Sequence, residues 1–198
     1  YLFHYKAMAF LSLVAYFRTY RYNEKKRKAG IKNMNEQDIK NLVEKQRNFF
    51  HSGITLDVDY RIQALKKLKA CIQQNENLIC NALKKDLGKS RYESYMCEVG
   101  LVLSELSYMI RHTRSYAKEK TVRTPLAQFH SRSFQKPSPY GVVLVMSPWN
   151  YPFLLTIDPL IDALAAGNTV VLKPSAYSPY ISAIIQSMIE ECFDARYV

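Results

Sequence analysis

The chain has few of the residues that build disulfide or metal scaffolds: it holds four cysteines in 198 residues, and no two are spaced as C-x-x-C. No histidine stands beside them at the spacing of a zinc site. These absences argue against a metal centre and for a reducing compartment, which we take to be the cytoplasm. Cys71, Cys80 and Cys192 each fall within an apolar helical pattern, so we expect buried, unreactive thiols there.

Long apolar runs are scarce as well. The apolar stretch at residues 7–17 is shorter than the roughly 20 residues that a membrane-spanning helix needs. A secretory signal peptide carries its positive charge before the apolar run, whereas here the basic residues 18–28 follow it. The sequence therefore predicts neither a membrane-spanning segment nor a signal peptide at these positions.

The net charge of +11 is concentrated at the start of the chain. Residues 1–33 hold eight Lys or Arg and one Glu, which makes seven of the eleven net charges. Since the remainder mixes both signs, we expect no nucleic-acid-binding fold. We interpret residues 1–33 as a leader outside the folded core, translated from a ribosome-binding site ahead of a true start at Met34. A weak membrane-surface anchor is the alternative.

Residues 34–120 show helical periodicity and predict four helices. The first has Asn35 as a candidate N-cap, and the fourth opens with Ser90 and Glu93, an S-x-x-E capping box. Between them we expect one helix carrying Ile62 to Ile72 and another that follows Asn75 and ends at Gly88. Their apolar faces predict a helical core without chemistry of its own.

The pattern changes at residues 121–139, where three prolines forbid a continuous helix. Residues 129–136 alternate loosely and predict an exposed strand or arm suited to oligomerisation. From residue 140 the pattern is strand–helix–strand–helix. The runs Val142–Met146 and Thr169–Leu172 suit parallel strands covered on both faces.

The helix between these strands is expected to end at Gly167, with Pro159 in its first turn or at a kink. Ser178 and Pro179 predict the N-cap and first residue of the next helix. The order of elements predicts an α/β protein: a helical amino-terminal segment followed by the start of a doubly wound, Rossmann-like parallel-sheet domain. Since two strands make a poor sheet, we expect residues 140–198 to be its first half, with the domain cut short and no catalytic domain.

Ligands of doubly wound folds bind outside the carboxyl ends of the strands. Two loops follow such ends here, at residues 147–150 and 173–176, and we expect them to lie side by side. The pair suggests a nucleotide-sized site with one cation, Lys173, although a solvated loop lysine explains that residue equally well. The G-x-G-x-x-G fingerprint of dinucleotide sites is absent.

Residues 139–176 resemble the aldehyde dehydrogenase superfamily. The resemblance is carried by P-W-N after the first strand and by A-A-G-N-T-V-V-L-K-P-S at the second, in the family's order and separation. W-N-Y-P-F and L-T-I-D-P are most similar to the class-3 branch, which includes fatty aldehyde dehydrogenases. The similarity extends back to about Met34 through D-L-G-K-S and R-I-Q-A-L.

The resemblance implies NAD- or NADP-dependent oxidation of an aldehyde to a carboxylic acid, with a homodimer as the intact protein. It implies that the Asn150 side chain stabilises the oxyanion and that Tyr151 and Leu154 border the aldehyde. It also implies that Lys173 binds the adenosine ribose. The remaining residues expected at the cofactor, together with Asn150 itself, are Met146, Ser147, Pro148, Trp149, Ser175 and Ala176.

Two departures from the family pattern shape these expectations. Many relatives have K-P-S-E, whose Glu binds the ribose 2′-hydroxyl, but this chain has Ala176. Since an acid would repel a 2′-phosphate, we expect the intact enzyme to accept NADP at least as well as it would with Glu at this position. The family's G-Q-x-C nucleophile and E-L-G-G-K base motifs do not occur in these residues, so we expect no turnover by this chain alone. A short, non-catalytic nucleotide-binding or dimer-interfering protein is the alternative.

Overall fold

The computed structural model describes residues 35–198. The proposed leader, residues 1–33, and its surface-anchor alternative lie outside the described residues. The first helix, α2 (Glu36–His51), begins as expected at Asn35, whose side-chain oxygen accepts the backbone N–H of Asp38 at 2.8 Å. Asp38 returns a bond to the backbone N–H of Asn35, so the two residues form a capping box.

The long helix α3 (Val58–Leu87) is central to the fold and contacts α5, α6 and α7. Our prediction of two helices separated near Asn75 was wrong. The Asn75 side chain donates to the carbonyl of Cys71 within the helix, so its amide is satisfied without a break. The apolar stripe then runs on without interruption, and its fully buried members are Leu65, Leu68, Ile72, Ile79 and Leu83. Gly88 ends the helix at φ +74°, as expected.

The predicted fourth helix is divided into three parts: α4 (Arg91–Ser94), a π-helical turn η2 (Tyr95–Val99) and α5 (Gly100–Tyr116). Ser90 caps its start by accepting the N–H of Glu93 at 3.1 Å. Two short 3₁₀ turns, η1 (Ile54–Leu56) and η3 (Leu126–Gln128), complete the irregular elements of the described residues.

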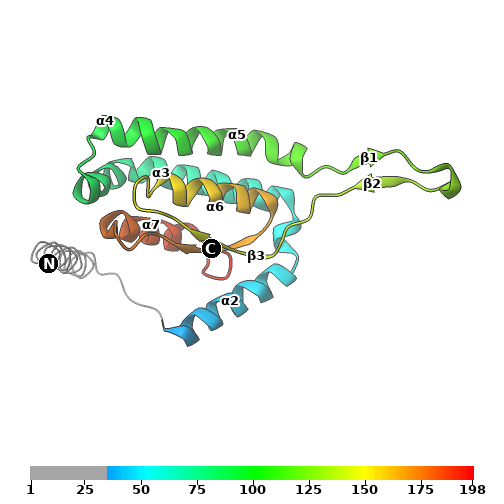
Figure 1. The fold of residues 1–198 in the computed structure, drawn as a ribbon, viewed down its shortest axis with the longest axis horizontal. Coiled ribbons are helices and arrows are strands. Elements are labelled where there is room, and N and C mark those ends of the chain that lie inside the picture. Colours follow the sequence, from blue (N-terminus) through cyan, green and yellow to red (C-terminus); the bar gives the residue numbers. More distant parts are fainter. Residues whose placement is uncertain (1–34) are drawn as a thin grey trace, which may run out of the picture.

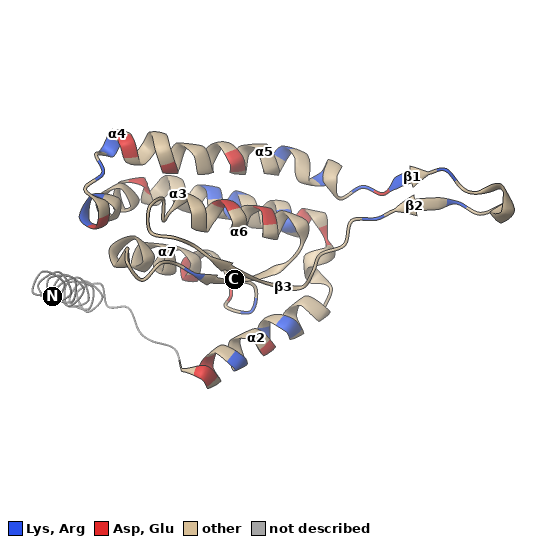
Figure 2. Ribbon diagram, viewed as in Figure 1, with Lys and Arg blue, Asp and Glu red and all other residues tan. Residues whose placement is uncertain are grey.

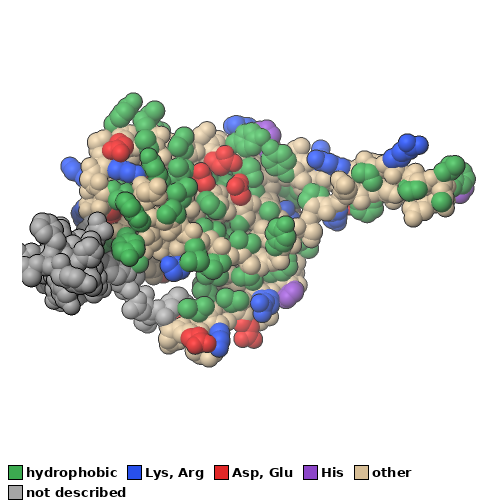
Figure 3. Space-filling model, in the orientation of Figure 1, with side chains coloured by type: hydrophobic (Ala, Val, Ile, Leu, Met, Phe, Trp, Pro, Cys, Tyr) green, Lys and Arg blue, Asp and Glu red, His purple; other side chains and the backbone are tan. Residues whose placement is uncertain are grey.

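The expected arm is an antiparallel hairpin of β1 (Lys120–Val122) and β2 (Ser133–Gln135) that extends away from the body of the molecule (Figure 1). Basic and apolar side chains are among those exposed along it (Figures 2 and 3), and Leu126 and Phe129, between its two strands, are 88% and 74% exposed. Among residues 35–198, no helix combines the length and apolar character needed to cross a membrane.

The expected parallel strands form: β3 (Val142–Met146) pairs with β4 (Thr169–Lys173), from Val142 opposite Thr169 to Met146 opposite Lys173. Figure 1 shows this small sheet between α2 and α6 (Leu154–Ala166), both of which contact the two strands. The prediction that both faces are covered was wrong for β3. Leu144 and Met146 are 57% and 64% exposed even though both α2 and α6 contact this strand.

The last elements follow the expected order. Helix α6 ends at Gly167 with φ +93°, but Pro159 lies in its second turn and not in its first. In α7 (Pro179–Cys192), Pro179 is the first residue as predicted. The Ser178 hydroxyl does not cap the helix. The carboxylate of Asp86, at the end of α3, accepts the N–H of Ile181 at 2.8 Å and does so instead.

Beyond β4 the chain returns to the sheet, where the carbonyl of Tyr197 accepts the N–H of Val170 at 2.9 Å. Cys71, Cys80 and Cys192 are buried, as predicted. In the part of the chain that the structure describes, no cluster of His, Cys, Asp or Glu side chains could hold a metal ion.

Gly167 is held against a buried arginine. The Arg61 guanidinium donates to the carbonyls of Thr55, Leu56 and Ala165, and a Cβ on Gly167 would lie 2.7 Å from its central carbon. Since those bonds prevent Arg61 from moving aside, we expect Gly167→Ala to lower the free energy of unfolding by about 2–4 kcal/mol. Urea denaturation measures this.

Gly88→Ala is the matched control, because Gly88 also has a positive φ but its Cβ would meet no atom within 4 Å. We expect a cost of about 1 kcal/mol for this variant, from backbone strain alone. Equal losses for the two variants would show that contact with Arg61 contributes nothing.

The fold destabilises the ionised form of the Asp158 side chain on α6. Burial, with Glu105 and Asp162 nearby, raises its pKa to about 6, and its Oδ1 has no hydrogen-bond partner within the described residues. Between about pH 4 and pH 6 the folded protein therefore keeps a proton that the unfolded chain releases. This contribution to stability is largest below pH 4 and is lost as the pH rises to 6.

Asp158→Asn removes the titration. We expect the variant to be more stable than the parent by about 1–2 kcal/mol at neutral pH, an estimate reduced for the partial exposure of the carboxylate. The difference should vanish near pH 4. Urea midpoints across this pH range test the expectation, with the exposed Glu44→Gln as control. A constant difference at every pH would contradict it.

Candidate functional site

The two predicted loops do lie side by side. Met146 and Lys173 are partners at the ends of β3 and β4, and the N–H of Ser147 donates to the carbonyl of Lys173 at 3.3 Å. Both strands end at the same edge of the sheet because they are parallel. The expectation that residues 147–150 and 173–176 share one surface is therefore confirmed.

Ser147 is fixed by the first turn of α6. Its hydroxyl lies 2.6 Å from that of Thr156, and the Thr156 hydroxyl donates to the carbonyl of Pro152 at 2.5 Å. Since Thr156 has one proton and gives it to Pro152, Ser147 must be the donor in its bond to Thr156. The start of the loop is thus tied to the helix that follows it.

Most of the side chains expected to contact the ligand are solvent-exposed. Trp149 is 54% exposed and Tyr151 is 41% exposed. Within residues 35–198 the side chains of Asn150 and Lys173 are exposed and take part in no hydrogen bond, so their polar groups are available. The other exposed members of the predicted set are Met146, Pro148 and Ala176.

Ser175 and Leu154 have structural contacts. Ser175 is buried, and its hydroxyl accepts the N–H of Tyr177 at 3.2 Å while its carbonyl accepts the Ser182 hydroxyl at 3.0 Å. Leu154 is half-buried against the core at the start of α6. Contact of Ser175 with a cofactor and of Leu154 with an aldehyde stays a prediction.

The P-W-N loop is anchored by two buried charged residues. Our sequence reasoning did not select them. Lys89, between α3 and α4, is 8% exposed, and Glu98 in the π-helical turn is fully buried. Their side chains meet at 2.5 Å. The Lys89 ammonium also donates to the carbonyl of Asn150 at 3.0 Å and lies 4.1 Å from the centre of the Tyr151 ring.

The second oxygen of Glu98 caps α6. It accepts the backbone N–H groups of Phe153 and Leu154 at 2.9 and 3.2 Å, where the helix's own residues supply no side-chain cap. A carboxylate at a helix N-terminus satisfies unpaired donors and opposes the positive end of the helix dipole. No local sequence signal marks this cap, because Glu98 precedes Phe153 by 55 residues.

The π-helical turn that carries Glu98 requires a glycine at its end. A Cβ on Gly100 would lie 2.9 Å from the carbonyl oxygen of Tyr95, closer than real contacts allow. Such turns occur frequently at functional sites because the extra residue changes which side chains face inward. Here the turn brings both Glu98 and Val99 into the interior.

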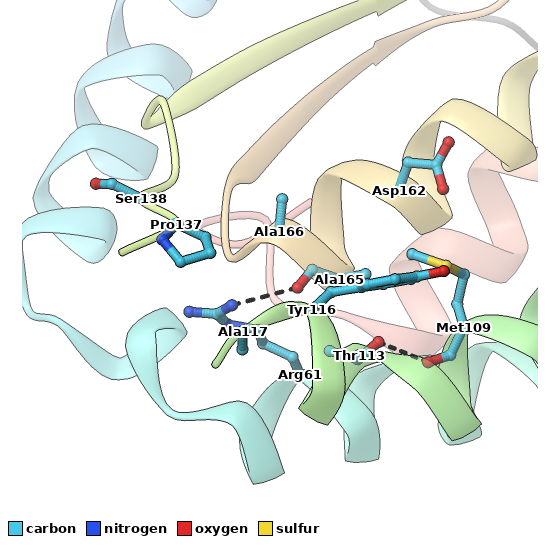
Figure 4. Close-up of a pocket in the computed structure, with 10 residues that line it drawn as sticks. All are labelled: Arg61, Met109, Thr113, Tyr116, Ala117, Pro137, Ser138, Asp162, Ala165 and Ala166. Atoms are coloured by element: carbon cyan, nitrogen blue, oxygen red, sulfur yellow. Dashed lines mark hydrogen bonds between the residues drawn. The ribbon is translucent and has the colours of Figure 1, made fainter. Parts of the chain in front are cut away.

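A cavity of about 210 Å³ lies at the opposite end of α6, between that helix, the end of α5 and the base of the arm (Figure 4). Arg61 and Asp162 are its charged members, and Met109, Tyr116 and Pro137 supply apolar surface. None of the predicted site residues lines it. The candidate site is therefore the open surface at the strand ends, not this cavity.

Comparison with known proteins identifies the family of the chain. The sequence model of the Aldehyde dehydrogenase family matches residues 16–195, which begins upstream of Met34. The chain is 40% identical to the 4,4'-diaponeurosporen-aldehyde dehydrogenase of Staphylococcus aureus over 80% of its length. It is 38% identical to aldehyde dehydrogenase family 3 member H1 of Arabidopsis thaliana over 84% of its length. It spans only 35% and 34% of those two proteins.

Solved structures give the same result. The substrate-bound structure of Staphylococcus aureus AldH superimposes with a TM-score of 0.79 at 40% identity, covering 83% of this chain and 35% of that one. A Streptococcus pyogenes succinic semialdehyde dehydrogenase in complex with NADP+ shares the fold, with a TM-score of 0.72 at 19% identity, covering 82% and 35%. The chain belongs to the aldehyde dehydrogenase family.

Proposed function

We propose that the protein to which this chain belongs oxidises an aldehyde to a carboxylic acid, with NAD or NADP as hydride acceptor. The observation that carries the proposal is the pairing of the P-W-N loop with Lys173 at adjoining strand ends, in a chain of this family. Ligands of doubly wound folds bind at such an edge.

The residues at this edge fit a dinucleotide. Trp149 and Met146 offer exposed apolar surface for a ring, and the exposed Lys173 offers a cation with three donors for ribose or phosphate oxygens. A relative from rat is named dimeric and NADP-preferring, and other members of the fold are solved with NAD+ or NADP+. When bound, the nicotinamide would supply the acceptor for the hydride that leaves the substrate carbon.

Asn150 is proposed as the oxyanion donor. Attack on an aldehyde turns the carbonyl oxygen into an anion, and a preorganised N–H donor stabilises that charge. The exposed amide of Asn150 has no other hydrogen bond within the described residues. Tyr151, next to it and 41% exposed, is proposed to border the aldehyde, together with Leu154.

The nucleophile is expected outside these 198 residues. None of the four cysteines stands in a G-Q-x-C motif; Cys71, Cys80 and Cys192 are buried in the helical core, and Cys97 is part-buried in the π-helical turn. Burial, followed by the neighbouring Cys71 thiol, raises the pKa of Cys192 to about 12, and burial also raises the pKa of Cys80. Since the thiolate is the reactive form, these groups are unsuited to attack. We expect this chain by itself not to turn over.

A second copy of the chain is the proposed partner of the arm, and the cytoplasm is the proposed compartment. The hairpin exposes Leu126, Phe129 and Phe134 far from the body of the molecule, and such apolar surface is usually covered in an assembly (Figure 3). The basic residues along the arm are too few to indicate a nucleic-acid site.

We expect the complete reading frame that contains this chain to yield a protein that reduces NAD or NADP in the presence of aldehydes. Asn150→Ala should lower kcat about 100- to 1000-fold, because one oxyanion donor is lost. Initial rates of reduced-nicotinamide formation across an aldehyde series measure both effects.

The control for this variant is Asn48→Ala, which removes an exposed asparagine side chain on α2. Full activity in Asn150→Ala would exclude Asn150 as the donor. A frame that ends at Val198, with nucleotide binding but no turnover, would favour the short nucleotide-binding protein.

The residue at position 176 tests cofactor choice. We expect Ala176→Glu to lower kcat/KM for NADP relative to NAD by roughly tenfold or more, because the new carboxylate would face the 2′-phosphate. Ala195→Glu, which adds the same charge after the far end of α7, serves as control. Strict preference for NAD in the parent protein, unchanged by Ala176→Glu, would refute the expectation.

A further inference from the structure

Asn150 needs a fixed orientation to act as an oxyanion donor, yet its own side chain has no partner within the described residues. Several hydrogen bonds restrain the loop around it. Ser147 is tied to Thr156 at the start, and Phe153 and Leu154 are tied to Glu98 at the end. Among residues 35–198, the Asn150 backbone makes its only hydrogen bond with Lys89.

We propose that Lys89 and Glu98 are positioning residues for Asn150. Lys89 holds the carbonyl of Asn150, which fixes the peptide plane joining residues 150 and 151 and so the direction in which the Asn150 side chain leaves the backbone. Glu98 holds Lys89 in turn, and it ties the same charge pair to the N-terminus of α6. This inference rests on the proposed function of Asn150.

Direct participation in the chemistry does not fit either residue. Glu98 has no exposed surface and Lys89 is 8% exposed, so neither can reach a substrate. Stability alone is also a poor reason for the pair, since buried ion pairs can often be replaced by apolar residues without loss. A single ammonium that contacts a carboxylate, the Asn150 carbonyl and the Tyr151 ring defines one loop geometry, and small misplacements of catalytic groups are costly.

The π-helical turn explains how Glu98 comes to lie there. With Gly100 permitting the turn, Glu98 is buried next to Val99 and points its two oxygens at different elements, Lys89 and α6. The Lys89–Glu98 pair therefore joins the segment after α3, the π-helical turn and the P-W-N loop. Of these three, the loop that carries Asn150 is the one exposed to a ligand.

Variants separate positioning from stability. Lys89→Met and Glu98→Gln each leave one buried group without its partner and should lower the urea midpoint. The double variant Lys89→Met/Glu98→Gln leaves no buried charge and keeps an oxygen acceptor for α6, so the midpoint should recover. The Asn150 carbonyl would still lack the hydrogen bond that Lys89 donates to it. Lys69→Met is the control, since Lys69 donates to Ser107 between α3 and α5, away from the loop.

Trp149 reports on the loop directly, because it is the only tryptophan of this chain and adjoins Asn150. We expect the Trp149 emission and acrylamide quenching of the double variant to differ from those of the wild-type chain, even though its urea midpoint recovers. In the protein from the complete reading frame, kcat should fall tenfold or more. Wild-type emission and kcat in the double variant would overturn the proposal.

If the wild-type protein oxidises no aldehyde, the proposed function fails, whereas the Trp149 signal still tests the positioning. If no variant folds, NMR of the wild-type chain tests whether Lys89 donates a hydrogen bond to Asn150. A scalar coupling across the hydrogen bond from the Lys89 Nζ to the carbonyl carbon of Asn150 is expected. Coupling to the Glu98 carboxylate without coupling to Asn150 would overturn the proposal.

Discussion

A carboxylate removed from water stays charged only where other groups replace the hydration that it loses. Glu98 is fully buried, and the replacement comes from the Lys89 ammonium and from two backbone N–H groups at the start of α6. These partners lie in different parts of the sequence, so the charge can be satisfied only when α3, the π-helical turn and α6 are all in place. The conformation of the P-W-N loop, which connects β3 to α6, is set by the same condition.

Helix α6 is held at both ends by a charge of the sign that its dipole favours. Glu98 accepts hydrogen bonds at its N-terminus, and the buried Arg61 donates to the carbonyl of Ala165 at its C-terminus. Burial lowers the pKa of Arg61 from its usual value. The helical part of the chain thus fixes the helix between the two strands, and through it the edge where Asn150 and Lys173 lie. The candidate site belongs to both parts of the fold, although its exposed residues come only from the second.

Elements with strong local signals could be predicted from the sequence. Asn35 with Asp38, Gly88 and Gly167 mark helix ends by their own chemistry, and the run Val142–Met146 marks its strand. Where the signal depended on distant partners, prediction failed. Asn75 looked like a break because its amide competes with the backbone, but it bonds within α3. The cap that Asp86 gives α7 and the pair Lys89–Glu98 join residues far apart in the chain, so no local pattern reveals them. The exposure of Leu144 and Met146 likewise follows from what lies over the sheet, not from the strand itself.

We expect the edge formed by β3 and β4 to receive a dinucleotide. Titration of this chain with NAD or NADP, followed through the emission of Trp149, tests it most directly. We predict a saturable change in emission that Lys173→Ala weakens, because the exposed tryptophan and the free cation lie at one edge. Unchanged emission at saturating nucleotide, in a chain shown to be folded, would contradict it.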